Sequence, residues 1–77
     1  MQTINYLDLG NQIFRPGAIV KAAVEFRNGF GVMKGGRIVG FKDAANNSTK
    51  NEDKIVIFNS LCGQRVYEAT AKHCKQL

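Results

Sequence analysis

The stretch FRNGFGVMKGGRIVGFKDAAN, from Phe26 to Asn46, combines two turn signals, two candidate strands and the start of a polar loop. Asn28-Gly29 lies between apolar runs, and both residues accept the positive backbone angles of a tight hairpin turn, so we expect a β-hairpin here. Gly35-Gly36 falls within the second strand and predicts a bulge, a sharp bend or a second turn. If that strand continues to Lys42, it is long and strongly bent, as at the corner of a small barrel. If it stops, the region is a meander of shorter strands.

The segment before the hairpin turn alternates between apolar and polar side chains, as a half-buried strand does. Its apolar positions are Val20, Ala22, Val24 and Phe26. Arg15-Pro16-Gly17 favours a turn just before it, because proline fixes its own backbone angle and disfavours helix in the preceding residue. The residues alone leave one alternative open, a helix that begins at Pro16 and ends at Gly29.

The remaining segments are a loop, one clear strand and two ambiguous ends. Residues 43–53 are polar and aperiodic, which predicts a loop, while Lys54–Phe58 is an apolar, β-branched run typical of a central strand. Residues 65–72 alternate as a last strand would, yet Glu68–Gln76 is also rich in helix formers, and Glu68 and Lys72 are spaced as a helical ion pair. Residues 1–11 form either a short helix or a first strand. The predicted fold is mainly β with a short helix at the N- or C-terminus, built on a small, strongly bent antiparallel sheet or barrel.

The 77-residue length suits one small domain, residues 1–77, with a small core that an oligomer would enlarge. Lys and Arg outnumber Asp and Glu by 11 to 6, which gives a formal net charge of +5. On so small a surface this predicts a positive potential over at least one face and favours nucleic acid or an acidic protein surface as partner. The alternative is a charge that only keeps the protein soluble.

Cysteine usage and hydropathy bear on location and chemistry. Two cysteines and no stretch typical of a secretion signal predict a cytoplasmic location, and the longest apolar run, Ile55–Phe58, predicts no membrane segment. Cys62, His73 and Cys74 lack the paired spacing of a structural zinc site, so we expect Cys62 to pack as a small apolar residue and His73-Cys74 to lie on the surface. A Cys-His nucleophile lacks any orienting group, and we expect no enzyme activity and no cofactor.

Two short motifs carry a family resemblance. Asn28-Gly29 is followed in order by Gly36, Ile38, Asp43 and Asn46. Residues 61–66, LCGQRV, place a glycine after a hydrophobic position and a β-branched residue three positions later, with Cys62 where a basic residue is usual. With the expected strand order, these motifs resemble those of the Sm-like family of small β-barrels, which form rings that bind RNA. The resemblance refines the predicted fold to a bent sheet or barrel of the SH3/Sm-like type.

The resemblance also implies a nucleic-acid-binding site. It places Asp43 and Asn46 in a base-reading loop, where an amide presents a donor and an acceptor to a base edge and a carboxylate orients that amide. It makes Gly63 a point of close approach, and Lys42 or Arg65 a source of phosphate contacts. The alternative is that Asp43 and Asn46 are turn residues bonded to their own backbone.

These observations favour a small, basic, homo-oligomeric protein that binds RNA or single-stranded DNA. Phenylalanines and Tyr67 interleaved with dispersed cations suit a single-strand binder, although burial preferences favour the core for Phe26 and Phe41. The alternative function is a small protein-binding inhibitor or phage-type accessory protein that acts on a larger host machine through its acidic surface or a strand edge.

Overall fold

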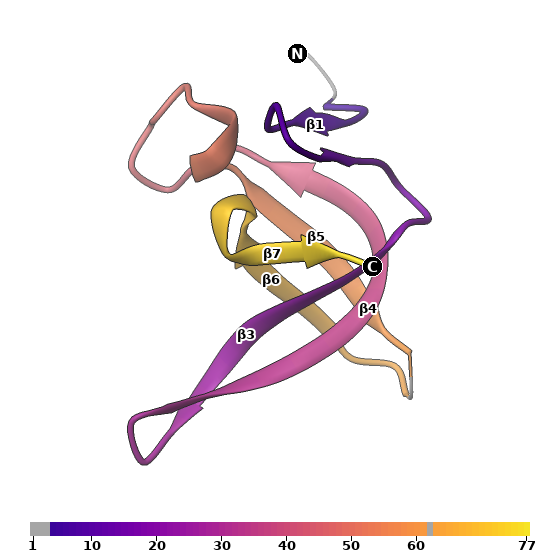
Figure 1. Ribbon diagram of the computed structural model, residues 1–77, viewed down its shortest axis with the longest axis vertical. Helices are drawn as coiled ribbons and strands as arrows, with labels where there is room; N and C mark the ends of the chain where they lie inside the picture. The colour runs from indigo at the N-terminus through magenta and orange to yellow at the C-terminus, as the bar shows by residue number, and fades with distance from the viewer. Residues whose placement is uncertain (1–3, 62) are drawn as a thin grey trace.

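The computed structural model describes residues 4–61 and 63–77, with residues 25–27 described through their backbone alone. It is a mainly β structure of two antiparallel sheets (Figure 1). The smaller sheet pairs β1 (Leu7–Asp8) with β2 (Ile13–Phe14). The larger has the strand order β6-β5-β4-β3-β7. Its strands are β3 (Ile19–Arg27), β4 (Phe30–Lys42), β5 (Ile55–Ser60), β6 (Val66–Thr70) and β7 (Cys74–Gln76), and two 3-10 turns, η1 (Asn51–Asp53) and η2 (Ala71–His73), precede β5 and β7.

The hairpin predicted at Asn28-Gly29 is confirmed. Asn28 has φ 50° and Gly29 has φ 80°, so both central residues have the positive angles that a primed turn needs. Arg27 and Phe30 close the ladder on either side of the turn. Residues 20–27 are therefore strand, and the alternative of a helix from Pro16 is wrong.

Strand β4 continues without a break through Gly35-Gly36, so the long, bent strand is the form the chain adopts (Figure 1). Gly36 pairs with Val20 of β3 on one side and with Ser60 of β5 on the other. A Cβ built on Gly36 would overlap the Asn59 carbonyl oxygen and the Phe58 ring. The bulges lie elsewhere, between Ala23 and Glu25 of β3 and between Ile38 and Gly40 of β4. Gly36 is required by close packing, and its backbone angles are not the reason.

We expect Gly36→Ala to destabilise the fold by about 1–3 kcal/mol or more, because a methyl group has no space between β4 and β5. Gly35→Ala is the matched control, since its Cβ would meet only the Val20 carbonyl oxygen at an ordinary 3.6 Å. Urea unfolding of both variants measures the difference. Equal stabilities for the two would contradict the close-packing role of Gly36.

The core lies on the concave side of the larger sheet. Its largest fully buried side chains are Leu7, Phe14, Val20, Ile38, Val56 and Phe58. Two of these, Leu7 and Phe14, come from the small β1-β2 hairpin, which thus belongs to the same core as the main sheet. Each side chain of this size contributes roughly 1.5–3 kcal/mol when buried. Phe41 packs partly against this cluster, as predicted, whereas Phe26 and Cys62 lie outside the described side chains.

Two parts of the predicted fold are corrected. The sheet is curved but does not form a closed barrel, since no ladder joins β6 to β7 within the described residues. Neither end of the described chain forms an α-helix: β1 and β2 form a hairpin near the N-terminus, and β6, η2 and β7 complete the chain. Glu68 pairs with Lys42 at 2.7 Å and Lys72 with Asp53 at 3.5 Å, so tertiary partners replace the predicted helical ion pair. No helix among the described residues is long and apolar enough to span a membrane.

Candidate nucleic-acid interface

The structure divides the five predicted site residues into two groups at opposite ends of β5. Lys42 pairs with Ile55, so Asp43 and Asn46 follow β4 at the start of β5. Gly63 and Arg65 lie in the β5-β6 turn beyond Ser60. Five residue steps separate the two ends of β5, about 17 Å at strand spacing. The two groups therefore do not line one pocket.

The first group differs in how its side chains are engaged. Lys42 is occupied by the ion pair with Glu68. The Asn46 side-chain oxygen accepts a hydrogen bond from the Ser48 backbone N–H at 3.1 Å. This contact is the one expected if Asn46 is a turn residue bonded to the nearby backbone. Asp43 is exposed, and its carboxylate makes no ion pair or hydrogen bond with the described part of the chain. Asp43 alone of the three has an unengaged side chain.

The loop between β4 and β5 is held by a second set of contacts. The Ser48 hydroxyl donates to Asp53 Oδ2 at 2.6 Å, and Lys72 of η2 lies 3.5 Å from Asp53 Oδ1. The Ser48 hydrogen bond, with help from Lys72 and Lys50, lowers the pKa of Asp53. The exposed loop is thus tied to η2 through a charged group that stays ionised at neutral pH.

The second group lines a groove next to the β3-β4 hairpin. Gly63 has φ 127°, a backbone angle that favours glycine, and the Arg65 carbonyl oxygen accepts from the Ser60 N–H at 2.8 Å to close the turn. Both residues share an open groove with Lys34 of β4 and Tyr67 of β6. Gly63 and Arg65 therefore lie beside a further cation and a ring, while their role in binding stays a prediction.

The sequence did not predict that several cations lie together on the convex face of the larger sheet, which is the face opposite the core. Lys21 of β3 lies directly opposite Lys75 of β7 and, on its other side, opposite Gly35 of β4. Arg37 follows two residues after Gly35, so it occupies the diagonal position, about 7–8 Å from Lys21. All three cations are exposed, and none has an ion pair within the described residues. The alternation of β3 indicated an outward Lys21, but no sequence signal gives its register with β7.

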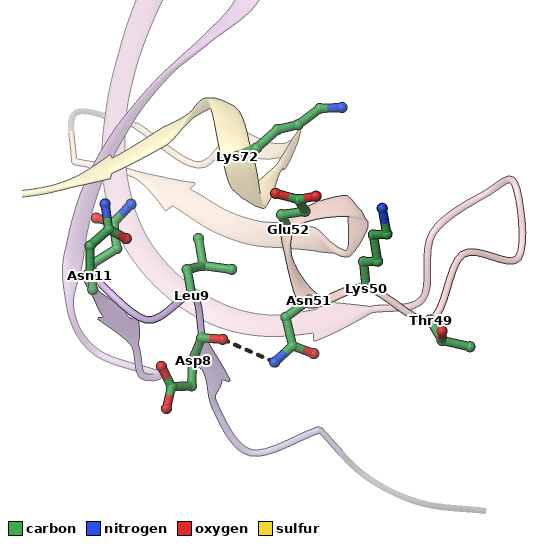
Figure 2. Close-up of a pocket in the computed structure, with 9 residues that line it drawn as sticks. Asp8, Leu9, Asn11, Thr49, Lys50, Asn51, Glu52 and Lys72 are labelled. Atoms are coloured by element: carbon green, nitrogen blue, oxygen red, sulfur yellow. Dashed lines mark hydrogen bonds between the residues drawn. The ribbon is translucent and has the colours of Figure 1, made fainter.

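A polar cleft lies between the β1-β2 hairpin, η1 and η2 (Figure 2). Asn51 donates from its side-chain nitrogen to the Asp8 carbonyl oxygen at 3.0 Å, which fastens the hairpin to the loop. The charged residues around it are Asp8, Glu52, Lys50 and Lys72. Because the two signs balance, this cleft does not provide the field that attracts a polyanion.

Cys74 is a core residue, which corrects the surface position predicted for the His73-Cys74 pair. His73 is exposed, but Cys74 is only 4% exposed, and its thiol donates to the Thr70 carbonyl oxygen at 3.4 Å. Burial raises the pKa of Cys74 from 9.0 to about 11. Within the described residues, no three His, Cys, Asp or Glu side chains lie close enough to hold a metal ion. The Cys74 thiol therefore has a packing role at neutral pH.

We expect Cys74 to make the protein less stable as pH rises from about 9 to about 11. The thiol ionises first in the unfolded chain, so unfolding releases a proton in this range and becomes more favourable. Urea unfolding between pH 8 and pH 11 in a Cys62→Ser background, with and without Cys74→Ala, isolates the effect. Identical pH dependence with and without Cys74 would contradict a raised thiol pKa.

Comparison of the chain with protein-family models, with curated proteins and with solved structures found no match. The Sm-like resemblance therefore stays a prediction that rests on two short motifs and on strand order.

Proposed function

We propose that this protein binds single-stranded nucleic acid, RNA or single-stranded DNA, on the convex face of β7, β3 and β4. The observation that carries the proposal is the cross-strand pair of Lys21 and Lys75, with Arg37 on the adjacent strand. The order of the larger sheet, in which the last strand lies beside β3, supports an SH3/Sm-like architecture for the binding domain.

The clustered cations lower the stability of the sheet through mutual repulsion, and an anionic ligand would remove this repulsion. Like charges directly opposite each other on neighbouring strands destabilise a sheet, with pair terms of about 0.2–1 kcal/mol. Lys21 lies within the Debye length of about 8 Å at physiological salt from both Lys75 and Arg37, so its potential adds to that of each neighbour. A phosphate backbone supplies negative charge at regular intervals and gains affinity by releasing its counterions.

An apolar surface beside the cations favours a single strand over a duplex. Val39 follows Arg37 along β4 and is 50% exposed. Ile19 lies opposite Arg37 on β3. Apolar side chains contact base faces when the bases are unpaired, whereas a duplex keeps these faces stacked. The mixture of cations and apolar groups therefore suits unpaired bases.

A second candidate function, protein binding in the cytoplasm or self-association into a homo-oligomer, has its own support. Strand β6 forms one edge of the larger sheet as described. Beside this edge Leu61 is 57% and Val66 is 58% exposed. An unpaired edge with apolar neighbours can accept a strand from an acidic partner protein or from a second copy. Solution mass, and capture from a nuclease-treated lysate, would test this function separately.

We expect binding to a fluorescein-labelled single-stranded oligonucleotide to weaken steeply with salt, with a slope of log affinity against log salt near −2 for three phosphate contacts. Lys21→Gln, Arg37→Gln and Lys75→Gln should each lower affinity and reduce the slope by about 0.7. Fluorescence anisotropy at salt concentrations from about 20 to about 200 mM measures both the affinity and its salt slope, because counterion release changes the affinity strongly over this range.

Lys50→Gln is the matched control for these variants. It removes the same charge from the polar cleft, where Asp8 and Glu52 already offset it. Affinity that falls equally in Lys50→Gln and Lys21→Gln would show an effect of net charge and contradict a site on the convex face. Absence of binding at low salt would refute the proposed function.

Lys75→Glu should change stability and binding in opposite directions. A carboxylate opposite Lys21 replaces repulsion by attraction, so the free energy of unfolding should rise by a few tenths to about 1 kcal/mol. The same change should abolish most of the oligonucleotide affinity. Thermal unfolding and anisotropy on the one variant measure both. Lower stability together with unchanged binding would contradict the charge conflict.

A further inference from the structure

A small pocket lies at the end of β4, on the strand that carries Arg37. Its volume is about 420 Å³. Apolar side chains of Ile4, Pro16, Val39 and Phe41 line part of it, and Asn5, Lys42 and Asp43 supply polar groups. Val39 begins two residues after Arg37, about 7 Å along the strand. The pocket is thus the next feature that a strand lying along β4 would reach.

Backbone contacts hold the pocket open. Gly17 donates from its N–H to the Ile38 carbonyl oxygen at 2.8 Å, and Ile38 donates to the Ala18 carbonyl oxygen at 2.9 Å. These bonds fix the turn that carries Pro16 against β4. Gly40 lines the pocket, and a Cβ added to it would meet no atom within 4 Å. The space next to Gly40 is therefore open in the folded structure.

Asp43 is the group in this pocket that determines which kind of ligand group can bind there. Its carboxylate has no ion pair or hydrogen bond within the described residues, although Lys42 is its neighbour in sequence. Lys42 extends instead to Glu68. An ionised carboxylate only accepts hydrogen bonds, and its two oxygens suit two parallel donors. Because Lys42, which also lines the pocket, is neutralised by Glu68, the unpaired Asp43 carboxylate would repel a phosphate, and the matching group on a nucleic acid is a base edge.

Guanine is the base whose Watson–Crick edge presents two adjacent donors, N1–H and the N2 amino group. The corresponding edges of adenine, cytosine and uracil place an acceptor beside the donor, and a carboxylate oxygen would face that acceptor. Apolar and aromatic walls accept the flat face of an unstacked base. Asp43 with Pro16, Val39 and Phe41 therefore has the chemistry for one unpaired guanine.

We propose that the Asp43 pocket binds a guanine base of the single strand whose phosphates lie on the convex face, and so gives this protein a base preference. The inference rests on the proposed function. Asp43 acts as the specificity-determining residue through N1–H and N2–H hydrogen bonds, and the apolar walls supply stacking.

The test compares labelled eight-nucleotide oligothymidylate with the same oligonucleotide carrying one central guanine, by anisotropy at low salt. We expect the guanine to tighten binding about tenfold, as one bidentate contact does. Inosine at the same position lacks the N2 amino group and should lose most of that gain. Asp43→Asn, which places a donor at the rim, and Gly40→Val, which adds a bulky side chain to the pocket lining, should each remove the preference.

Glu52→Gln is the matched control for Asp43→Asn, because it removes one exposed negative charge from η1, outside the pocket. It should leave the guanine preference intact. Salt-dependent binding with equal affinity for both oligonucleotides would overturn the guanine pocket and leave the proposed function standing. A guanine preference that persists in both Asp43→Asn and Gly40→Val would also overturn it. Absence of binding to either oligonucleotide would overturn both proposals.

Discussion

The close approach of β5 to β4 at Gly36 is the constraint on which the rest of the structure depends. Strand β4 has 13 residues and bends along its length (Figure 1). It bends while it pairs with β3 along one edge and β5 along the other. Gly36 lets the Asn59 backbone and the Phe58 ring reach the position where a Cβ would otherwise lie.

The two faces of the bent sheet carry different side chains. On the concave side, Val20 and Ile38 pack into a core that the β1-β2 hairpin joins through Leu7 and Phe14. On the convex side, the alternate positions Lys21 and Arg37 face solvent. Core and candidate interface are therefore built from neighbouring residues of the same strands. A change of register by one residue would exchange them, which ties the charged face to correct folding.

Local chemistry explains which elements could be predicted from the sequence. Asn28-Gly29 accepts the angles of its turn whatever surrounds it, and Lys54–Phe58 is apolar enough to require a central position, so both predictions are confirmed. The prediction of a C-terminal helix was wrong because contacts with distant parts of the chain determine the structure of this segment. Ala71 and Cys74 are buried in the core, and β7 pairs with β3. Helix propensity is too weak to compete with such burial.

The candidate site could be predicted in part from the sequence for the same reason. Asp43 follows the strand that the glycine pair and the alternation predict, so its place at the end of β4 could be anticipated. Its separation from Gly63 and Arg65 depends on the pairing of β5 with β4, and the opposition of Lys21 to Lys75 depends on a ladder between distant parts of the chain. A single sequence contains no local signal for either register.

The positions of the acidic residues determine which cations on the surface are neutralised and which are not. Glu68 and Asp53 neutralise Lys42 and Lys72 near the β4-β5 loop, whereas Lys21 and its cationic neighbours have no described acidic partner. A polyanion lying along β4 would be attracted at Arg37 and repelled at Asp43, unless the group facing Asp43 is a base. If the protein binds nucleic acid as proposed, attraction and repulsion on one strand would fix the register of the nucleic acid as well as its affinity, because moving it along β4 would place a phosphate against the carboxylate.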